Sequence, residues 1–227
     1  MLDDDRTMRG SRVTVNELKI GPLKTRETPR QKRAQDRVTK ILQATATALR
    51  TLPPHRVSTT IIAGLAGIPV SSIYRYFAAV EDIFDELYEQ STIEVDQRVL
   101  AVFADPETYP GWRDRHRAVY AELRKYRNEH PYYLPLLRSS IARTGPETVD
   151  IEKRTGVPYF LADRWANGED GFQGGDPNVV AEVTIQLFLA IEGFVASEVS
   201  AEQADTYFEE VSLSIESYLA NYLSDRR

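Results

Sequence analysis

A short segment in the first third of the chain carries hydroxyl and guanidinium side chains at nearly consecutive positions. Ser71, Ser72, Tyr74, Arg75 and Tyr76 follow one another with a single interruption. Serine and tyrosine hydroxyls suit phosphate oxygens, and an arginine can bond either a phosphate or the edge of a guanine. The segment is therefore a candidate for contact with a nucleic acid, and its arginine is the first candidate for contacting a base.

Three predicted helices would present this segment at the surface. The first covers residues 30–52 and stops at Pro53, which begins a proline pair. Ser58 is a good N-cap for a second helix, which Gly67 ends because glycine allows a positive φ. A third short helix is predicted over residues 70–77, and this order of helices is the layout of a helix-turn-helix. The small core of the unit is predicted to contain Ile62, Ile68, Ile73 and Phe77.

Charge is divided unevenly along the chain. Residues 1–80 hold 14 Lys+Arg against 6 Asp+Glu, a net charge of +8, whereas residues 81–227 hold 14 against 28, a net charge of −14. This asymmetry is typical of a protein whose one end meets a polyanion. Residues 1–29 are polar and lack periodicity, so a disordered basic arm is predicted there. Basic side chains of the first helix that are further candidates for DNA contact are Arg30, Lys32 and Arg33.

The rest of the chain keeps a helical spacing of apolar residues and never alternates long enough for a sheet. Helices are predicted over residues 82–103, 112–129, 131–142, 146–165 with an interruption, 178–200 and 201–223. Four glycines between residues 168 and 177 predict the longest loop of this region. The expected fold is all-α, with about nine helices: an N-terminal helix-turn-helix unit over residues 30–80 and a larger bundle over residues 81–227.

Aromatic residues gather in this larger bundle. A helical bundle rich in aromatic side chains can leave a cleft for a small molecule, although each ring could equally belong to an ordinary core. The candidate pocket residues are Phe103, Trp112, Tyr120, Tyr126, Tyr133, Phe160, Trp165 and Phe188. Such a cleft would suit a mainly apolar or aromatic compound.

The last two predicted helices are apolar over more than one face. A helix with so broad an apolar arc needs a neighbour outside its own chain as well as one inside it. The candidate interface between two copies of the chain consists of Val183, Leu187, Ile191, Phe194, Val211, Ile215, Tyr218 and Tyr222. A homodimer is therefore predicted.

Other classes of protein find little support in the 227 residues. There is no cysteine, the three histidines lie far apart, and no glycine-rich phosphate loop opens a helix, so we expect no catalytic site, no metal site and no cofactor. No apolar run approaches the roughly 18 residues needed to span a bilayer, so we expect no membrane partner. The first residues lack the apolar region of a signal peptide, and we expect a cytoplasmic protein.

The helix-turn-helix segment resembles the TetR family of transcriptional regulators. The resemblance rests on residues 59–68, on residues 72–77 and on Glu81, and it extends over about 50 residues from Arg33 to Phe84. It implies DNA contacts from Thr59, Val70, Ser71, Ser72, Tyr74 and Tyr76. The sequence departs from the family pattern at Pro69, where serine is usual, and at Val80, where a lysine commonly reaches a backbone phosphate.

The resemblance implies a ligand-responsive regulator, in its usual mode a repressor, that binds a palindromic operator of double-stranded DNA as a dimer and is released by a small-molecule effector. Two alternatives remain open at this point. The chain could be a protein-interaction module that keeps the helix-turn-helix fold without binding DNA, as the absence of lysine at position 80 allows. It could also be a helical enzyme, for which no motif was found.

Overall fold

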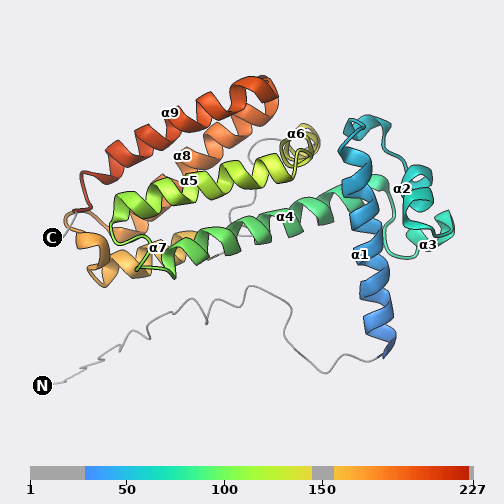
Figure 1. Ribbon diagram of the computed structural model, residues 1–227, viewed down its shortest axis with the longest axis horizontal. Helices are drawn as coiled ribbons and strands as arrows, with labels where there is room; N and C mark the ends of the chain where they lie inside the picture. Colours follow the sequence, from blue (N-terminus) through green and yellow to red (C-terminus); the bar gives the residue numbers. More distant parts are fainter. Residues whose placement is uncertain (1–28, 145–155, 225–227) are drawn as a thin grey trace, which may run out of the picture.

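A computed structural model describes residues 29–144 and 156–224 of the chain (Figure 1). The described residues form nine α-helices and two 3-10 turns, without a strand among them. The α-helices are α1 (Pro29–Leu49), α2 (Thr59–Ala66), α3 (Val70–Ile73), α4 (Val80–Phe103), α5 (Trp112–Glu129), α6 (Tyr133–Thr144), α7 (Val157–Ala166), α8 (Pro177–Glu198) and α9 (Ala201–Leu219). The all-α fold expected from the sequence is confirmed. The predicted basic arm, apart from its last residue, lies outside the described residues.

Helices α1 to α3 form a compact unit at one end of the molecule, which we call the head. The Ser58 hydroxyl caps α2 by accepting a hydrogen bond from the Ile61 backbone N–H at 3.4 Å. Gly67 ends the helix with φ of 63° and ψ of 39°, the left-handed conformation that glycine adopts without strain. Both signals were predicted from the sequence and both are present in the structure.

Helix α3 is shorter than predicted. It ends at Ile73, and the chain continues through a turn over residues 74–76 rather than as helix to Phe77. The Phe77 ring is buried, and its N–H still reaches the Ile73 carbonyl at 3.0 Å. Two tyrosines in the turn are weak helix formers, and the chain must change direction here to enter α4. Tyr74, Arg75 and Tyr76 therefore lie on a turn directly after the helix.

Helix α4 runs from the head into the bundle of the remaining helices, which we call the body (Figure 1). The Asp82 carboxylate accepts a hydrogen bond from the Ala79 N–H at 2.9 Å and so caps the start of α4. Near that start, Ile83 and Phe84 are buried in the core of the head, whereas Val95 and Val99 further along are buried in the core of the body. One continuous helix therefore joins the two cores.

A second connection between head and body runs through α6. Tyr132, just before this helix, and Leu136 within it are buried in the core of the head. The helix also contacts the 3-10 turn η1 (Pro54–Arg56), and the Arg50 guanidinium donates to the Glu129 carbonyl at 3.2 Å. The head is thus held to the body by two elements rather than by a flexible linker.

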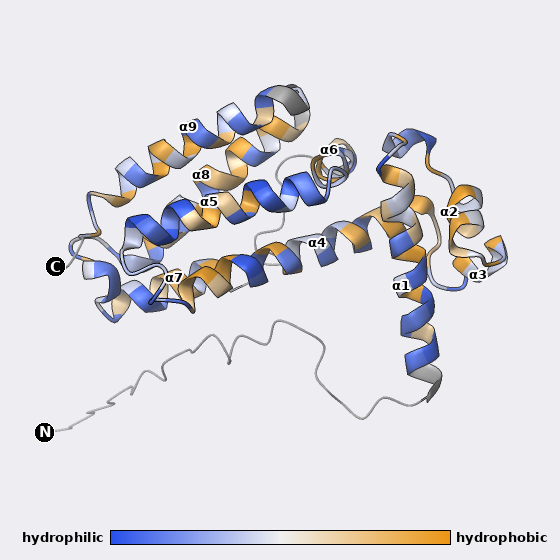
Figure 2. Cartoon of the chain, in the orientation of Figure 1, coloured by the Kyte–Doolittle hydropathy of each residue, from blue (hydrophilic) through white to orange (hydrophobic). Residues whose placement is uncertain are grey.

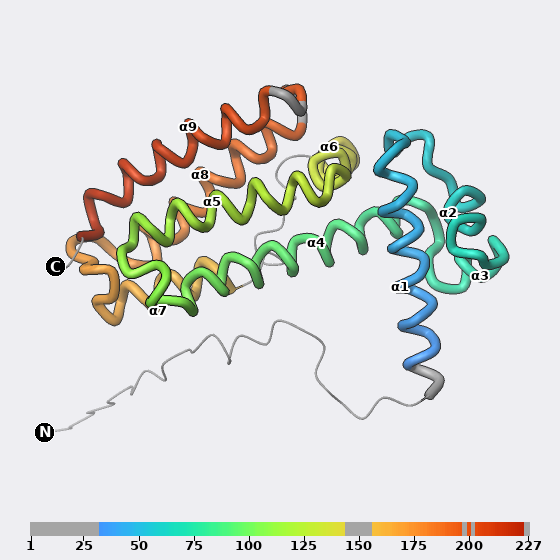
Figure 3. Tube along the Cα trace, in the orientation of Figure 1, coloured from blue at the N-terminus to red at the C-terminus, as the bar shows by residue number. Residues whose placement is uncertain are grey.

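The body consists of α4 to α9 and has its own core. Helices α8 and α9 lie side by side in opposite directions, with α7 against α8 and α5 against α9 (Figure 3). Several helix boundaries differ from the prediction: α1 ends at Leu49 instead of residue 52, α6 starts at Tyr133 instead of residue 131, and α9 ends at Leu219 instead of residue 223. The loop after α7 contains the 3-10 turn η3 (Glu169–Gly171). Hydropathy colouring shows α8 as mainly hydrophobic and the N-terminal part of α1 as mainly hydrophilic (Figure 2).

From the sequence we expected no apolar stretch long enough to span a membrane, and α8 differs from this expectation. Residues Pro177–Ala196 are long and apolar enough to cross a membrane by length and composition, although a third of them are buried inside the protein. One such helix does not indicate a membrane span, because the core helices of soluble proteins reach the same length and hydropathy. This helix packs against α6, α7 and α9, and its Glu192 carboxylate is buried and accepts a hydrogen bond from Tyr133 at 2.9 Å.

Candidate functional site

The turn after α3 presents its polar side chains outward. Ile73 is fully buried, which rotates the neighbouring Ser71 and Arg75 into solvent. Tyr74 is 56% exposed and Tyr76 is 38% exposed, unusually high fractions for tyrosines next to a packed core. These side chains are therefore free to contact another molecule. The predicted contact residues Val70 and Ser72 are half-buried.

A hydrogen bond ties the start of α2 to this turn. The Thr59 hydroxyl lies 3.2 Å from the Tyr74 hydroxyl, although the two residues are 15 positions apart. Both residues belong to the predicted DNA-contact set, and the structure brings them together at one surface. The bond orients the exposed Tyr74 ring with respect to α2.

Basic side chains of α1 extend the polar surface of the head. Lys32 and Arg33 are exposed, whereas the side chain of Arg30 lies outside the described part of the structure. Across residues 29–80 the sequence holds eight lysines and arginines and a single acidic residue, Asp36. The head therefore has an excess of positive charge that suits a phosphate backbone.

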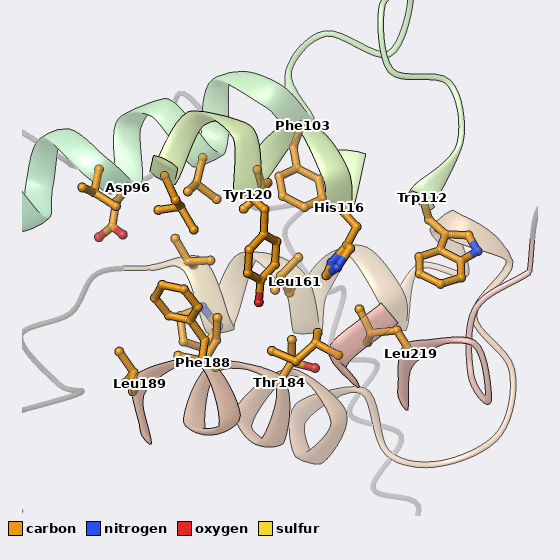
Figure 4. A pocket seen from close by; sticks show the side chains of 18 of the residues that line it. Asp96, Phe103, Trp112, His116, Tyr120, Leu161, Thr184, Phe188, Leu189 and Leu219 are labelled. Atoms are coloured by element: carbon orange, nitrogen blue, oxygen red, sulfur yellow. The ribbon is translucent and has the colours of Figure 1, made fainter. Parts of the chain in front are cut away.

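The body contains an apolar cavity of about 140 Å³ (Figure 4). Its wall is formed by side chains of α4, α5, α7, α8 and α9, together with Tyr133 at the start of α6. Among the predicted pocket residues, those that line it are Phe103, Trp112, Tyr120, Tyr133, Trp165 and Phe188. The cavity lies between these helices, within the core of the body.

Two residues of the predicted pocket lie elsewhere. Tyr126 is 1% exposed and packs edge-to-face on Tyr133, with ring centroids 5.6 Å apart. Phe160 packs edge-to-face on Phe103 with a centroid distance of 5.4 Å, behind the wall of the cavity. Both rings fill the core around the cavity instead of facing it, because their positions on α5 and α7 point to a neighbouring helix.

Polar residues also line the cavity, and the sequence did not single them out. These are Thr92, Asp96, His116, Asp170 and Thr184. Their types and spacing are ordinary for helices and loops, so only the spatial arrangement shows that they line the cavity. The Thr184 hydroxyl donates to the Val180 carbonyl at 2.7 Å within α8.

His116 is held from the side of α9. Its Nε2 lies 2.9 Å from the Ser212 carbonyl and 3.1 Å from the Ser212 hydroxyl. Burial lowers the pKa of the imidazole, more than the nearby Glu216 carboxylate and the bond to Ser212 raise it. Because the carbonyl can only accept, Nε2 carries the proton in the neutral ring. The cavity therefore faces a neutral histidine.

A buried ion-pair network closes one end of the cavity. The Asp170 carboxylate pairs with Arg115 and accepts bonds from Arg164 at 2.8 and 2.9 Å. Burial by itself would raise the pKa of Asp170, but the hydrogen bonds and charges of Arg164, with the charge of Arg115, outweigh it and hold the pKa below its usual range. This carboxylate is therefore ionised and already neutralised by the protein.

Helices α8 and α9 carry apolar side chains on their outer surface. Leu187 and Phe194 of the predicted interface are 41% and 44% exposed. Val179, Tyr207 and Leu213 are also at least 40% exposed and were missing from the predicted set. These three side chains lie on the same two helices and enlarge their exposed apolar surface. The ring centroids of Phe194 and Tyr207 lie 5.5 Å apart.

The remaining predicted interface residues are less accessible. Val211 and Ile215 are buried in the protomer's own core, and Ile215 also lines the cavity, so these two face inward and not toward a partner. The half-buried ones are Val183, Ile191, Tyr218 and Tyr222. On α9 the buried Phe208 directly follows the exposed Tyr207, so hydrophobicity alone does not distinguish the inner side of the helix from its outer side.

No family model matches the sequence. A curated relative, the uncharacterized HTH-type transcriptional regulator YhgD of Bacillus subtilis, is 26% identical over 165 residues, which cover 69% of this chain and 82% of the relative. A solved structure of a regulator assigned to the TetR family from Mesorhizobium loti matches with a TM-score of 0.63 and 20% identity over 87% of this chain and 100% of that one.

A second solved structure is SmeT, the repressor of the multidrug efflux pump SmeDEF of Stenotrophomonas maltophilia. It matches with a TM-score of 0.54 and 18% identity over 83% of this chain and 91% of SmeT. The chain therefore has the fold of the TetR-family regulators, and the resemblance noted in the sequence is confirmed in three dimensions. These relatives are named as regulators of transcription, which agrees with the expectation of a protein that is not an enzyme.

Proposed function

We propose that the protein is a ligand-responsive transcriptional regulator that binds a palindromic operator as a homodimer and acts as a repressor. The observation that carries the proposal is the exposure of Tyr74, Arg75 and Tyr76 directly after the buried Ile73. A small, rigid unit that exposes hydroxyls and a guanidinium beside a basic helix suits the phosphates and base edges of a major groove. The proposed division of the chain is a DNA-binding unit over residues 30–80 and a sensing and dimerising unit over residues 81–227.

Dimerisation is proposed through the outer surface of α8 and α9. Leu187, Phe194 and Tyr207 expose apolar area that a second copy of the chain would cover around a two-fold axis. The two heads of such a dimer, about one helical turn of DNA apart, would each bind one half of a palindrome. Arg75 of each head is the residue proposed to contact a base. The residues proposed to contact the DNA backbone beside it are Thr59, Val70, Ser71 and Ser72.

The cavity is the proposed site of a small, mainly apolar effector. SmeT, which shares the fold with a TM-score of 0.54, has been solved in a complex with triclosan, which supports this use of the body. Tyr133 lines the cavity while the preceding Tyr132 is buried in the core of the head. A ligand that shifts Tyr133 would therefore move α6 against the head, and α4 offers a second route.

Linkage then makes operator and effector oppose each other. If the effector prefers a body conformation that changes the separation of the two heads, each ligand weakens the other by the same factor, about 5- to 150-fold in typical cases. Repression would be relieved because the paired heads no longer fit the spacing of the half-sites.

In the decisive experiment, fragments that the protein binds are selected from the genomic DNA of the organism that encodes it. A labelled fragment is then titrated with the protein by fluorescence anisotropy. A specific complex is expected whose affinity falls steeply between low and moderate salt, because bound phosphates release counterions. Salt-independent binding, or none, would favour the alternative of a protein-interaction module with a helix-turn-helix fold.

Arg75→Ala tests the base-reading residue in the same assay. The loss of a bidentate base contact is expected to weaken operator binding by about 10- to 100-fold and to relax sequence preference. Arg124→Ala is the matched control, since Arg124 is exposed on α5 and paired with Glu209 in the body. Equal affinities of the two variants would contradict the assignment of Arg75.

A further inference from the structure

We infer that the cavity selects an uncharged effector of single-ring size that carries one hydrogen-bonding group, and that the Tyr120 hydroxyl is the residue that recognises this group. The inference rests on the proposed function for the role of the cavity as an effector site. It adds the chemical class of the ligand and the specificity-determining residue, and it follows from the size, the polarity and the charge of the wall.

The size of the cavity limits the ligand. Its volume of about 140 Å³ is close to that of an apolar cavity of about 150 Å³ that holds one benzene molecule in another protein. Most drug-sized ligands occupy pockets of roughly 300 Å³ or more. Aromatic rings of the wall, such as Tyr120 and Phe188 with centroids 6.0 Å apart, offer edge-to-face contacts to a planar guest.

Tyr120 supplies the polar contact. Figure 4 shows its ring reaching into the cavity, with the hydroxyl toward the side formed by Phe188 and Thr184. The hydrogen bonds found in the described chain include none to this hydroxyl, whereas Tyr133 donates to Glu192 and His116 is bound to Ser212. Burial raises the pKa of Tyr120 above its usual value, so the hydroxyl stays protonated and can both donate and accept.

The charge of the wall excludes a ligand anion. Asp96 and Asp170 both line the cavity, and no lysine or arginine lines it within residues 29–144 and 156–224. A carboxylate guest would lose its hydration beside the Asp96 carboxylate, with no lysine or arginine of the described wall to pair with, which is unfavourable. For a cation, the Asp170 carboxylate offers little attraction because Arg115 and Arg164 already neutralise it, so Asp96 alone would have to offset the lost hydration. An uncharged guest avoids both costs.

The two tryptophans of the chain provide the readout. Trp112 and Trp165 are the only tryptophans in the sequence, and both line the cavity. Ligand binding to the full chain without DNA can therefore be followed by tryptophan emission, excited at the red edge of the absorption band, where phenol does not absorb. The probes are phenol and toluene, which have similar shape and differ in the hydroxyl, together with benzoate and benzylammonium.

The variant Tyr120→Phe removes only the hydroxyl. Phenol is expected to bind this variant about three- to tenfold more weakly than the wild type, whereas the affinity for toluene changes less than about twofold. Tyr126→Phe is the matched control on the same helix, because its ring does not line the cavity, and it should leave both affinities unchanged. Benzoate and benzylammonium are expected to bind at least about tenfold more weakly than phenol.

Three results would overturn the inference: equal losses for phenol and toluene in Tyr120→Phe, tighter binding of a charged probe than of phenol, or no emission change with any probe up to its solubility. Operator binding is measured on the same preparations by anisotropy. If it persists while the probes fail, only the ligand class is wrong. If the probes behave as expected and DNA binding is absent, the proposed function is wrong.

Discussion

The head and the body have hydrophobic cores of different construction. The core of the head is mainly aliphatic, with Ile41, Ile62 and Ile73 fully buried. The core of the body contains more aromatic rings, and a cavity of about 140 Å³ opens within it. Close aliphatic packing fixes one arrangement of helices, whereas a hollow aromatic core can be filled and rearranged by a guest.

This difference corresponds to the two proposed tasks. A surface that matches DNA must keep a fixed shape. Tyr74 and Arg75 meet this requirement because they lie on a turn of only a few residues next to Ile73. A sensing unit must change shape when a small molecule binds, and a cavity provides the volume for that change. The two cores meet along α4 and at Tyr132, so we expect a change in one core to reach the other.

The largest difference between the cores is expected in their response to truncation. Ile62→Ala should lower the free energy of unfolding by about 3–4 kcal/mol, because it leaves a new cavity in a filled core. Leu161→Ala, on the wall of the existing cavity, should cost about half as much, because this side chain already lacks neighbours on one side. Urea denaturation of both variants measures the difference. Equal costs would show that the two cores are packed alike.

The surface of α8 provides the next test, since only the body is proposed to dimerise. Phe194→Glu places a charge on the exposed apolar face, so we expect a monomer in light scattering and operator affinity at least about 100-fold lower through loss of the paired heads. Tyr159→Glu is the control, because Tyr159 is 77% exposed on α7. A dimeric Phe194→Glu variant would move the interface elsewhere.

A smaller effect on the free energy of unfolding is expected from the protonation of His116, a residue of the body. Burial lowers its pKa below the ordinary value of 6.5, so the unfolded chain binds the proton first as the pH falls. The free energy of unfolding should therefore fall between about pH 7.5 and pH 5.5, by at most about 1.4 kcal/mol per pH unit from this group. His116→Gln should flatten that dependence, and His55→Gln, at an exposed position of the head, should not.

The smallest effect is expected at the junction of head and body. Val80 begins α4 and is half-buried against the head, where the family commonly has a lysine that reaches a phosphate. Val80→Lys is expected to raise operator affinity a few-fold and to make the salt dependence steeper by about one unit, because one more phosphate is neutralised. Val80→Met, of similar length without charge, is the control in the anisotropy titration. An unchanged slope would mean that the lysine does not reach the DNA.

Local signals in the sequence determined most of the fold. The proline pair after residue 52, the Ser58 cap and the left-handed Gly67 act over a few residues, so helix ends in the head could be predicted closely. The end of α3 was predicted wrongly, because the turn over residues 74–76 depends on the entry into α4 as well as on the weak helix propensity of its tyrosines.

The tertiary structure alone decided what the body does with its apolar residues. Helical spacing marks the apolar positions, but it cannot say whether a ring faces a neighbouring helix, a cavity or a partner. Tyr120 and Tyr126 both lie on α5, yet only Tyr120 lines the cavity, and Ile215 faces inward while Leu213 is exposed. These outcomes depend on how α4, α5, α7, α8 and α9 pack together, and contacts between residues far apart in sequence leave no local signal to predict them from.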